Sequence, residues 1–154
     1  MRTTTTLCVI YKYPDILLGM KKRGFGVGRW NGFGGKPHPG EPIQNAAIRE
    51  IREECGLRAD RLEKVGLIEF TFEKTGDVQE VHFFLCEDFT GEPVETEEME
   101  PRWFPITELP YADMWPDDKF WMPLLIGGKK FAGKFIFGED GRIKNHTLEI
   151  IDEI

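Results

Sequence analysis

A run of glycines followed at once by a helix pattern constrains this chain more than any other feature. Residues 24–40 contain seven glycines, and this share predicts a loop whose backbone can approach a ligand closely. From residue 43 to residue 55, apolar side chains recur every four positions, which predicts a helix with one apolar stripe. Gly56 stands where a helix often ends in a left-handed residue. The rest of the chain therefore has to fold around this loop and this helix.

The remaining sequence has the alternation and the turn residues of strands. We expect seven strands, over residues 7–11, 16–22, 62–72, 78–86, 103–105, 130–137 and 146–151. A helical turn at 107–109 should stop at Pro110, and a second helix should begin at Pro116 and run to about Ile126. This order predicts an α+β fold with a mixed sheet rather than a series of βαβ units.

Length, charge and cysteine content narrow the class of protein. The 154 residues fit a single domain spanning 1–154, and no apolar run approaches the roughly 20 residues of a membrane helix. The first residues show no secretory leader pattern, and three cysteines suggest no disulfide framework or zinc site, so we expect a cytoplasmic or other reducing compartment and no membrane partner. A net charge of −7 argues against a nucleic-acid polymer as partner. It leaves room for a small phosphorylated ligand that arrives with a divalent cation.

The predicted helix carries an acidic cluster on a second face. Glu50, Glu53 and Glu54 stand at i, i+3 and i+4, so their side chains lie close together. The flanking Arg49 and Arg52 are expected to point elsewhere, which leaves the cluster without a counter-charge. Oxygen ligands of this kind suit Mg²⁺. Taken alone, the cluster is more typical of a solvated charged face than of a metal site.

The spacing around the cluster is far more specific. Gly35, Glu41 and residues 49–57 give the pattern G-x5-E-x7-R-E-U-x-E-E-x-G-U, where U is apolar, without an exception. This pattern resembles the signature of the Nudix hydrolases, with seven fixed and two apolar positions over 23 residues. The resemblance implies an α/β/α sandwich that contains the loop and helix. It also implies cleavage of nucleoside diphosphate derivatives by metal-assisted attack of water, with Mg²⁺, or alternatively Mn²⁺, as cofactor.

The resemblance also implies a role for each matching residue. The implied metal ligands are oxygen donors, including one main-chain carbonyl: Gly34, Glu50, Glu53, Glu54 and Glu98. The implied catalytic residues are Arg49, which would orient the carboxylates, Glu53, and either Glu54 or Glu98 as the group that takes a proton from water. Glu41 would support the loop.

Segments outside the signature resemble the family members that act on oxidised purine nucleoside triphosphates. They include residues 17–26, 28–36 and 114–118. The substrate-binding residues implied in this way, with Phe25 as a further candidate for lining the pocket, are Thr6, Lys21, Asn31, Phe33, Gly34, Gly35, Lys36, Phe70, Phe72, Trp115, Pro116, Asp117 and Asp118. Trp115 offers a stacking face, and the amide of Asn31 can both donate and accept.

Asp117 and Asp118 support a narrower hypothesis. If both face a dry pocket, burial and mutual repulsion should raise the pKa of one of them. One retained proton would then let the pair bind both 8-oxoguanine and 2-hydroxyadenine. The same Trp-Pro-Asp-Asp sequence is also typical of a helix start, with acids near the positive end of the dipole.

These features together predict a monomeric, Mg²⁺-dependent enzyme whose partner is a small nucleotide. It would release the monophosphate and pyrophosphate from oxidised purine nucleoside triphosphates. Two alternatives stay open: a substrate such as an O6-methylated or unmodified purine nucleotide, and a catalytically silent nucleotide-binding module. The intact set of Glu50, Glu53 and Glu54 argues against the silent module.

Overall fold

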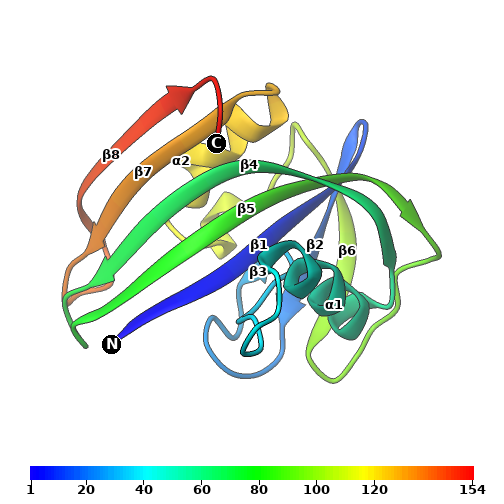
Figure 1. Ribbon diagram of the computed structural model, residues 1–154, viewed down its shortest axis with the longest axis horizontal. Helices are drawn as coiled ribbons and strands as arrows, with labels where there is room; N and C mark the ends of the chain where they lie inside the picture. The colour runs from blue at the N-terminus through cyan, green and yellow to red at the C-terminus, as the bar shows by residue number, and fades with distance from the viewer.

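The computed structural model describes residues 1–154, which build one mixed sheet with a helix on each face (Figure 1). The elements in chain order are β1 (Arg2–Lys12), β2 (Asp15–Lys21), β3 (Trp30–Asn31), α1 (Ile43–Cys55), β4 (Arg58–Phe72), β5 (Asp77–Thr90), β6 (Met99–Pro105), a 3₁₀ turn η1 (Tyr111–Asp113), α2 (Asp118–Ile126), β7 (Lys130–Phe137) and β8 (Ile143–Ile151). The eight strands run in the order β3-β2-β1-β5-β4-β7-β8, and β6 pairs with β2. Because β1–β5 and β4–β7 are parallel and the other pairs antiparallel, the predicted α+β fold with a mixed sheet is confirmed.

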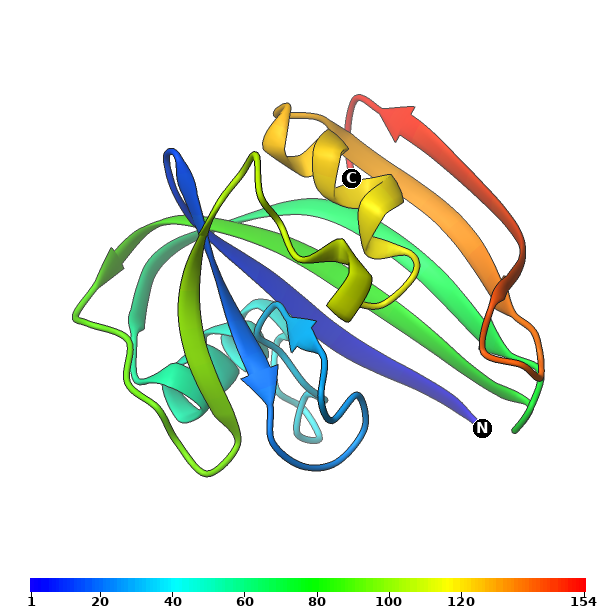
Figure 2. The ribbon, with the colours of Figure 1, turned by 180° about the vertical axis from the view of Figure 1, so that it is seen from behind.

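The alternation of strand residues separates two cores, one under each helix. On β1, Cys8 and Ile10 pack on the face that α1 covers. Their neighbours Val9 and Tyr11 pack on the opposite face, in the core that includes Trp121 of α2. Successive side chains of a strand point to opposite faces, so one strand serves both layers. Figure 2, seen from behind, shows α2 in front of the sheet and α1 beyond it.

The glycine-rich loop continues the sheet where β1 and β2 diverge. These two strands pair only from Ile10 to Lys12 on the β1 side. Beyond that point Cys8 exchanges main-chain hydrogen bonds with Phe33, and the Thr6 N–H donates to the Gly35 carbonyl at 2.9 Å. The loop therefore lies against β1 before it enters α1. A Cβ atom on Gly34 would lie 1.8 Å from the Thr6 carbonyl oxygen, so this approach requires glycine.

Several predicted boundaries were wrong for identifiable reasons. A single turn does form before Pro110, closed by the Glu108 N–H and the Pro105 carbonyl at 2.9 Å, but the 3₁₀ helix forms after it, at Tyr111–Asp113. Helix α2 begins at Asp118, not at Pro116, because residues 115–118 first form a turn closed by the Asp118 N–H and the Trp115 carbonyl at 3.1 Å. The two-residue strand β3 was not predicted. It forms by pairing with Gly19 and Met20 rather than from any local alternation.

Neither helix has both the length and the apolar character needed to cross a membrane.

Candidate active site

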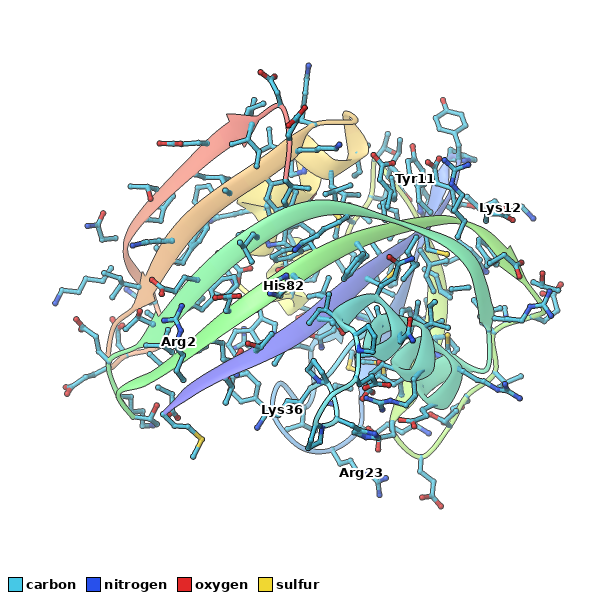
Figure 3. The ribbon with its side chains drawn as sticks, in the orientation of Figure 1. Arg2, Tyr11, Lys12, Arg23, Lys36 and His82 are labelled. Carbon is cyan, nitrogen blue, oxygen red and sulfur yellow. The ribbon has the colours of Figure 1, made fainter.

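A cavity of about 830 Å³ opens beside the glycine-rich loop, a size that suits a small ligand. Most of the predicted site residues line it: Thr6, Lys21, Asn31, Gly34, Gly35, Lys36, Glu54, Phe70, Phe72, Trp115, Asp117 and Asp118. Phe25 also lines it, as expected. Figure 3 shows Arg23, on the loop after β2, and Lys36, on the glycine-rich loop, in the lower part of the view. The cavity thus brings residues of the loop–helix unit together with the segment that leads into α2.

Two residues predicted to bind substrate do not line this cavity. Phe33 is fully buried in the core under α1, because it pairs with Cys8 and its side chain takes the same face of the sheet. Pro116 lines a separate hollow, together with Lys119 and Phe120. The neighbouring Trp115 and Asp117 face the main cavity, so Pro116 between them points away from it.

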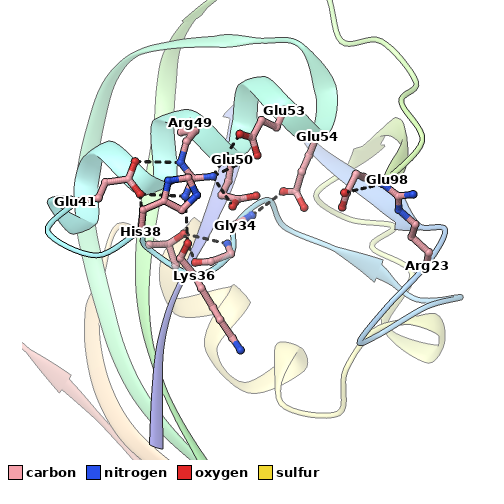
Figure 4. Close-up of polar contacts among 12 residues, drawn as sticks. Arg23, Gly34, Lys36, His38, Glu41, Arg49, Glu50, Glu53, Glu54 and Glu98 are labelled. Atoms are coloured by element: carbon pink, nitrogen blue, oxygen red, sulfur yellow. Dashed lines mark hydrogen bonds and ion pairs between the residues drawn. The ribbon is translucent and has the colours of Figure 1, made fainter.

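The guanidinium of Arg49 is the centre of the loop–helix unit (Figure 4). It donates to both carboxylate oxygens of Glu41 at 3.0 Å, to Glu50 at 2.9 Å and to the Lys36 carbonyl at 3.1 Å. It also forms an ion pair with Glu53 at 3.3 Å. The expectation that Arg49 points away from the acids was wrong, because its long side chain folds back along the helix. These hydrogen bonds hold the pKa of Glu41 at about 2 and raise the pKa of Arg49.

Glu54 is the buried member of the acidic cluster. Its side chain accepts a hydrogen bond from the Gly34 N–H at 2.9 Å, and only 2% of the residue is exposed. Burial raises the pKa of Glu54 to about 8, with the charges of Glu50 and Glu98 acting in the same direction, while the Gly34 N–H and Lys21 oppose the shift. Burial also raises the pKa of Glu50. Two neighbouring carboxylates with raised pKa values would both be stabilised as anions by an added cation.

Glu98 and Glu53 lie at the rim of the cluster and are more exposed. Glu98 forms ion pairs with Arg23 at 3.1 Å and with Lys21 at 3.9 Å. In this arrangement no three acidic, histidine or cysteine side chains converge closely enough to hold a metal ion. One oxygen of each of Glu50, Glu54 and Glu98 accepts a hydrogen bond, from Arg49, the Gly34 N–H and Arg23, respectively. The oxygen donor set fits a hard cation such as Mg²⁺ chemically, and its side chains would have to move closer together to bind one.

The other functional part of the cavity is aromatic and contains two buried acids. Trp115 lies 5.0 Å from Phe25 and 6.5 Å from Phe72, measured between ring centroids. Asp117 and Asp118 are 5% and 4% exposed, and Asp117 accepts a hydrogen bond from the Trp121 indole at 2.8 Å. Burial and the charge of Asp117 raise the pKa of Asp118 well above its usual value. Burial also raises the pKa of Asp117, so this pair retains a proton that two solvated carboxylates would lose.

Arg29 also lines the cavity, although it was not among the predicted site residues. Its guanidinium lies 4.3 Å from the centroid of the Trp115 ring. A basic residue between the loop glycines and Asn31 was a visible signal for an anionic ligand. Its contact with Trp115 joins segments far apart in the chain and was not visible from the sequence.

Comparisons with known proteins agree on one family. A family model described as the NUDIX domain matches residues 1–125. The chain is 48% identical over 147 residues to the oxidized purine nucleoside triphosphate hydrolase of Mus musculus, covering 96% of this chain and 94% of that protein. It is 45% identical over 149 residues to the protein of the same name from Danio rerio, covering 97% and 96%.

A solved structure shows the same fold at lower sequence identity. The crystal structure of a mutator MutT protein from Bacillus halodurans superposes with a TM-score of 0.85 at 24% identity, covering 96% of this chain and 97% of that one. The uninterrupted signature from Gly35 to Leu57, the loop and helix that it builds, and these matches all agree. The chain belongs to the Nudix family.

Proposed function

We propose that the protein hydrolyses oxidised purine nucleoside and deoxynucleoside triphosphates to the monophosphate and pyrophosphate, with Mg²⁺ as cofactor. One observation carries the proposal: the cavity that contains Glu54 of the Nudix helix also contains the buried pair Asp117–Asp118 beside Trp115. The first group suits phosphate chemistry, and the second suits a purine edge. The names of the mouse and zebrafish relatives support the same substrate class.

The base would be recognised by stacking and by hydrogen bonds in a dry pocket. Trp115 supplies an aromatic surface, and the side-chain carbonyl of Asn31 is a free acceptor while its NH₂ group donates to the Arg29 carbonyl. A carboxylate pair that holds one proton offers one O–H donor and several acceptors. This mixture lets one pocket bind purines whose edges differ, such as 8-oxoguanine and 2-hydroxyadenine.

The loop–helix unit would hold the phosphates and the cation. The Gly34 carbonyl and the carboxylates of Glu50, Glu53, Glu54 and Glu98 would be the ligands. When bound, Mg²⁺ offsets phosphate charge and makes a water molecule more acidic. Lys21 and Lys36, which line the cavity, would contact phosphate oxygens. Arg49 keeps Glu50 and Glu41 in place from the far side of the cluster.

Glu54 is the better candidate than Glu98 for taking a proton from the attacking water. Glu54 lines the cavity and is fixed by the Gly34 N–H, whereas Glu98 lies outside the cavity lining and is paired with Arg23. Replacement of Glu54 by Gln would retain its size and remove its basicity. Turnover at the parent rate by this variant would contradict the assignment and would favour Glu98 as the group that takes the proton.

The deciding experiment compares kcat/KM for 8-oxo-dGTP, 2-hydroxy-dATP, O6-methyl-dGTP and dGTP with Mg²⁺, and identifies the products. We expect at least a tenfold preference for the two oxidised purines over dGTP. Equal values for 8-oxo-dGTP and dGTP would contradict the proposed substrate class, and a preference for O6-methyl-dGTP would favour the alternative. Repetition with Mn²⁺ tests the choice of metal.

We also propose that the protein acts as a monomer in a reducing compartment such as the cytoplasm. The support for this compartment is that Cys8, Cys55 and Cys86 are all buried and unpaired.

A further inference from the structure

Arg29 occupies an unusual position for a charged residue, because it lines the cavity and forms no ion pair with any carboxylate. It directly precedes β3 on the glycine-rich loop. A partly buried guanidinium without a counter-ion costs free energy, so a contact of another kind should account for it. Its three contacts all lead to groups that we assign to base recognition.

The first contact fixes Asn31. The main-chain carbonyl of Arg29 accepts a hydrogen bond from the Asn31 side-chain NH₂ at 2.8 Å. The same carbonyl accepts from the Lys21 N–H at 3.1 Å, which ties it to β2. The amide of Asn31 therefore has a defined orientation before a ligand arrives.

The second contact fixes Trp115. The guanidinium carbon of Arg29 lies 4.3 Å from the ring centroid, and the Arg29 Nη1 donates to the Met114 carbonyl at 3.4 Å. Since Arg29 covers one face of the indole, a base cannot stack on that face while Arg29 stays there. The side chain thus bridges the glycine-rich loop and the segment between η1 and α2, which are otherwise far apart in the chain.

The third interaction is electrostatic and reaches the aspartate pair. The positive charge of Arg29 lowers the pKa of both Asp117 and Asp118, against the larger effect of burial. The other groups that face the pair are the Trp121 N–H from α2 and Tyr111 from η1. Neither of these is charged at neutral pH, so Arg29 is the charged side chain among these three.

We propose that Arg29 is the positioning residue of the base pocket: its carbonyl orients Asn31, its guanidinium holds Trp115, and its charge acts on the aspartate pair. The proposal rests on the proposed function, because it takes the aspartate end of the cavity as the base site. Arg29 itself contacts the groups that read the base and need not touch the reacting phosphates.

Two substitutions separate the shape of Arg29 from its charge. Arg29→Lys keeps the charge and loses the planar group over Trp115, whereas Arg29→Gln loses both. Arg102→Gln is the matched control, since Arg102 lies on β6 outside the cavity, with its guanidinium 5.1 Å from the Trp30 ring. For each variant we would measure the dissociation constant of 8-oxo-dGMP without metal from pH 6 to pH 9, KM and kcat for 8-oxo-dGTP, and the thermal midpoint.

We expect both Arg29 variants to raise the dissociation constant and KM at least tenfold, with kcat within threefold of the parent. In Arg29→Gln the loss of affinity at high pH should move to higher pH, because the aspartate pair keeps its proton longer without the cation. In Arg29→Lys this alkaline limit should stay at the parent position. Arg102→Gln should match the parent in all three binding and kinetic values.

A dissociation constant within twofold of the parent in Arg29→Lys and Arg29→Gln would overturn the proposal, as would an alkaline limit that is the same in both variants. If Arg29→Gln fails to fold, the affinity of Arg29→Lys alone decides whether the planar group matters. Failure of the proposed function looks different: the parent protein would then show no preference for 8-oxo-dGTP over dGTP. The effects of Arg29 on dGMP binding would still be measurable in that case.

Discussion

Gly34 is the position where a single added methyl group should lower the stability of the fold most. A Cβ atom added at Gly34 would stand 1.8 Å from the Thr6 carbonyl oxygen and 2.5 Å from its carbon, whereas close C···O contacts are about 3.3 Å or longer. The backbone fixes both atoms of this contact, because the loop is paired to β1 by the Thr6–Gly35 and Cys8–Phe33 hydrogen bonds. The clash therefore cannot be relieved by rotating a side chain, and the loop must move about 1.5 Å away from β1 to restore an ordinary contact.

The expected cost follows from what that movement breaks. Overpacking in a rigid site costs about 1–3 kcal/mol. The displaced loop also loses a main-chain hydrogen bond to Thr6 and the bond from the Gly34 N–H to Glu54, each worth about 1 kcal/mol or more. We expect Gly34→Ala to lower the free energy of unfolding by about 4 kcal/mol, a large part of the roughly 5–15 kcal/mol that stabilises a typical domain.

Urea denaturation and Mg²⁺-dependent hydrolysis would test this expectation together. Gly28→Ala is the matched control: it lies in the same loop with a positive φ of 82°, but its Cβ would meet no atom within 4 Å. Backbone strain alone should cost this variant about 1–2 kcal/mol. Gly35→Ala is intermediate, since its Cβ would lie 2.7 Å from the Glu50 carboxylate, which can rotate. Equal denaturation midpoints for Gly34→Ala and Gly28→Ala would refute the reasoning.

Three further predictions concern the site. Because the pKa of Glu54 is raised to about 8 from its ordinary value of 4.5, the stability that its protonated form contributes is present below pH 4.5 and lost as the pH rises through 8. Mg²⁺ should therefore raise the thermal midpoint more at about pH 8.5 than at about pH 6.5. Glu54→Gln should remove this pH dependence. An equal rise of the parent's midpoint at both pH values would contradict the prediction. Trp115→Ala should raise KM for 8-oxo-dGTP by about 5- to 150-fold, from a stacking energy of about 1–3 kcal/mol, and an unchanged KM would exclude stacking on this ring. Asp118→Asn should change the ratio of kcat/KM for 8-oxo-dGTP and 2-hydroxy-dATP, whereas an unchanged ratio in this variant and in Asp117→Asn would rule out the shared proton.

The features that could be predicted from the sequence are those that local spacing determines. The helix at residues 43–55 has the predicted bounds, because an apolar stripe and a following glycine are local signals. The alternation of apolar and polar residues also predicted the strands of the mixed sheet. The pairing of β3 and β6 with β2 could not be predicted, since both pairs depend on contacts between distant segments.

Side-chain direction was harder to predict than secondary structure. Helical spacing fixes where the Cβ of Arg49 points, but the rotatable bonds beyond it let the guanidinium return to Glu50 and Glu41. Phe33 faces the core for a non-local reason, namely its pairing with Cys8. Arg29 was missed because its role depends on Trp115, a residue in a distant segment of the chain.

The acidic cluster shows how the two kinds of information combine. By sequence, Glu50, Glu53 and Glu54 are equivalent members of one helix face. In the structure they differ, because the glycine-rich loop pairs with β1 and brings the Gly34 N–H against Glu54. Glu54 is buried, and this burial raises its pKa although the Gly34 N–H lowers it, while Glu53 stays in solvent beside Arg49. The helix places the carboxylates, but it is the close approach of a glycine to Thr6, permitted by the missing side chain, that makes one of them chemically distinct from the others.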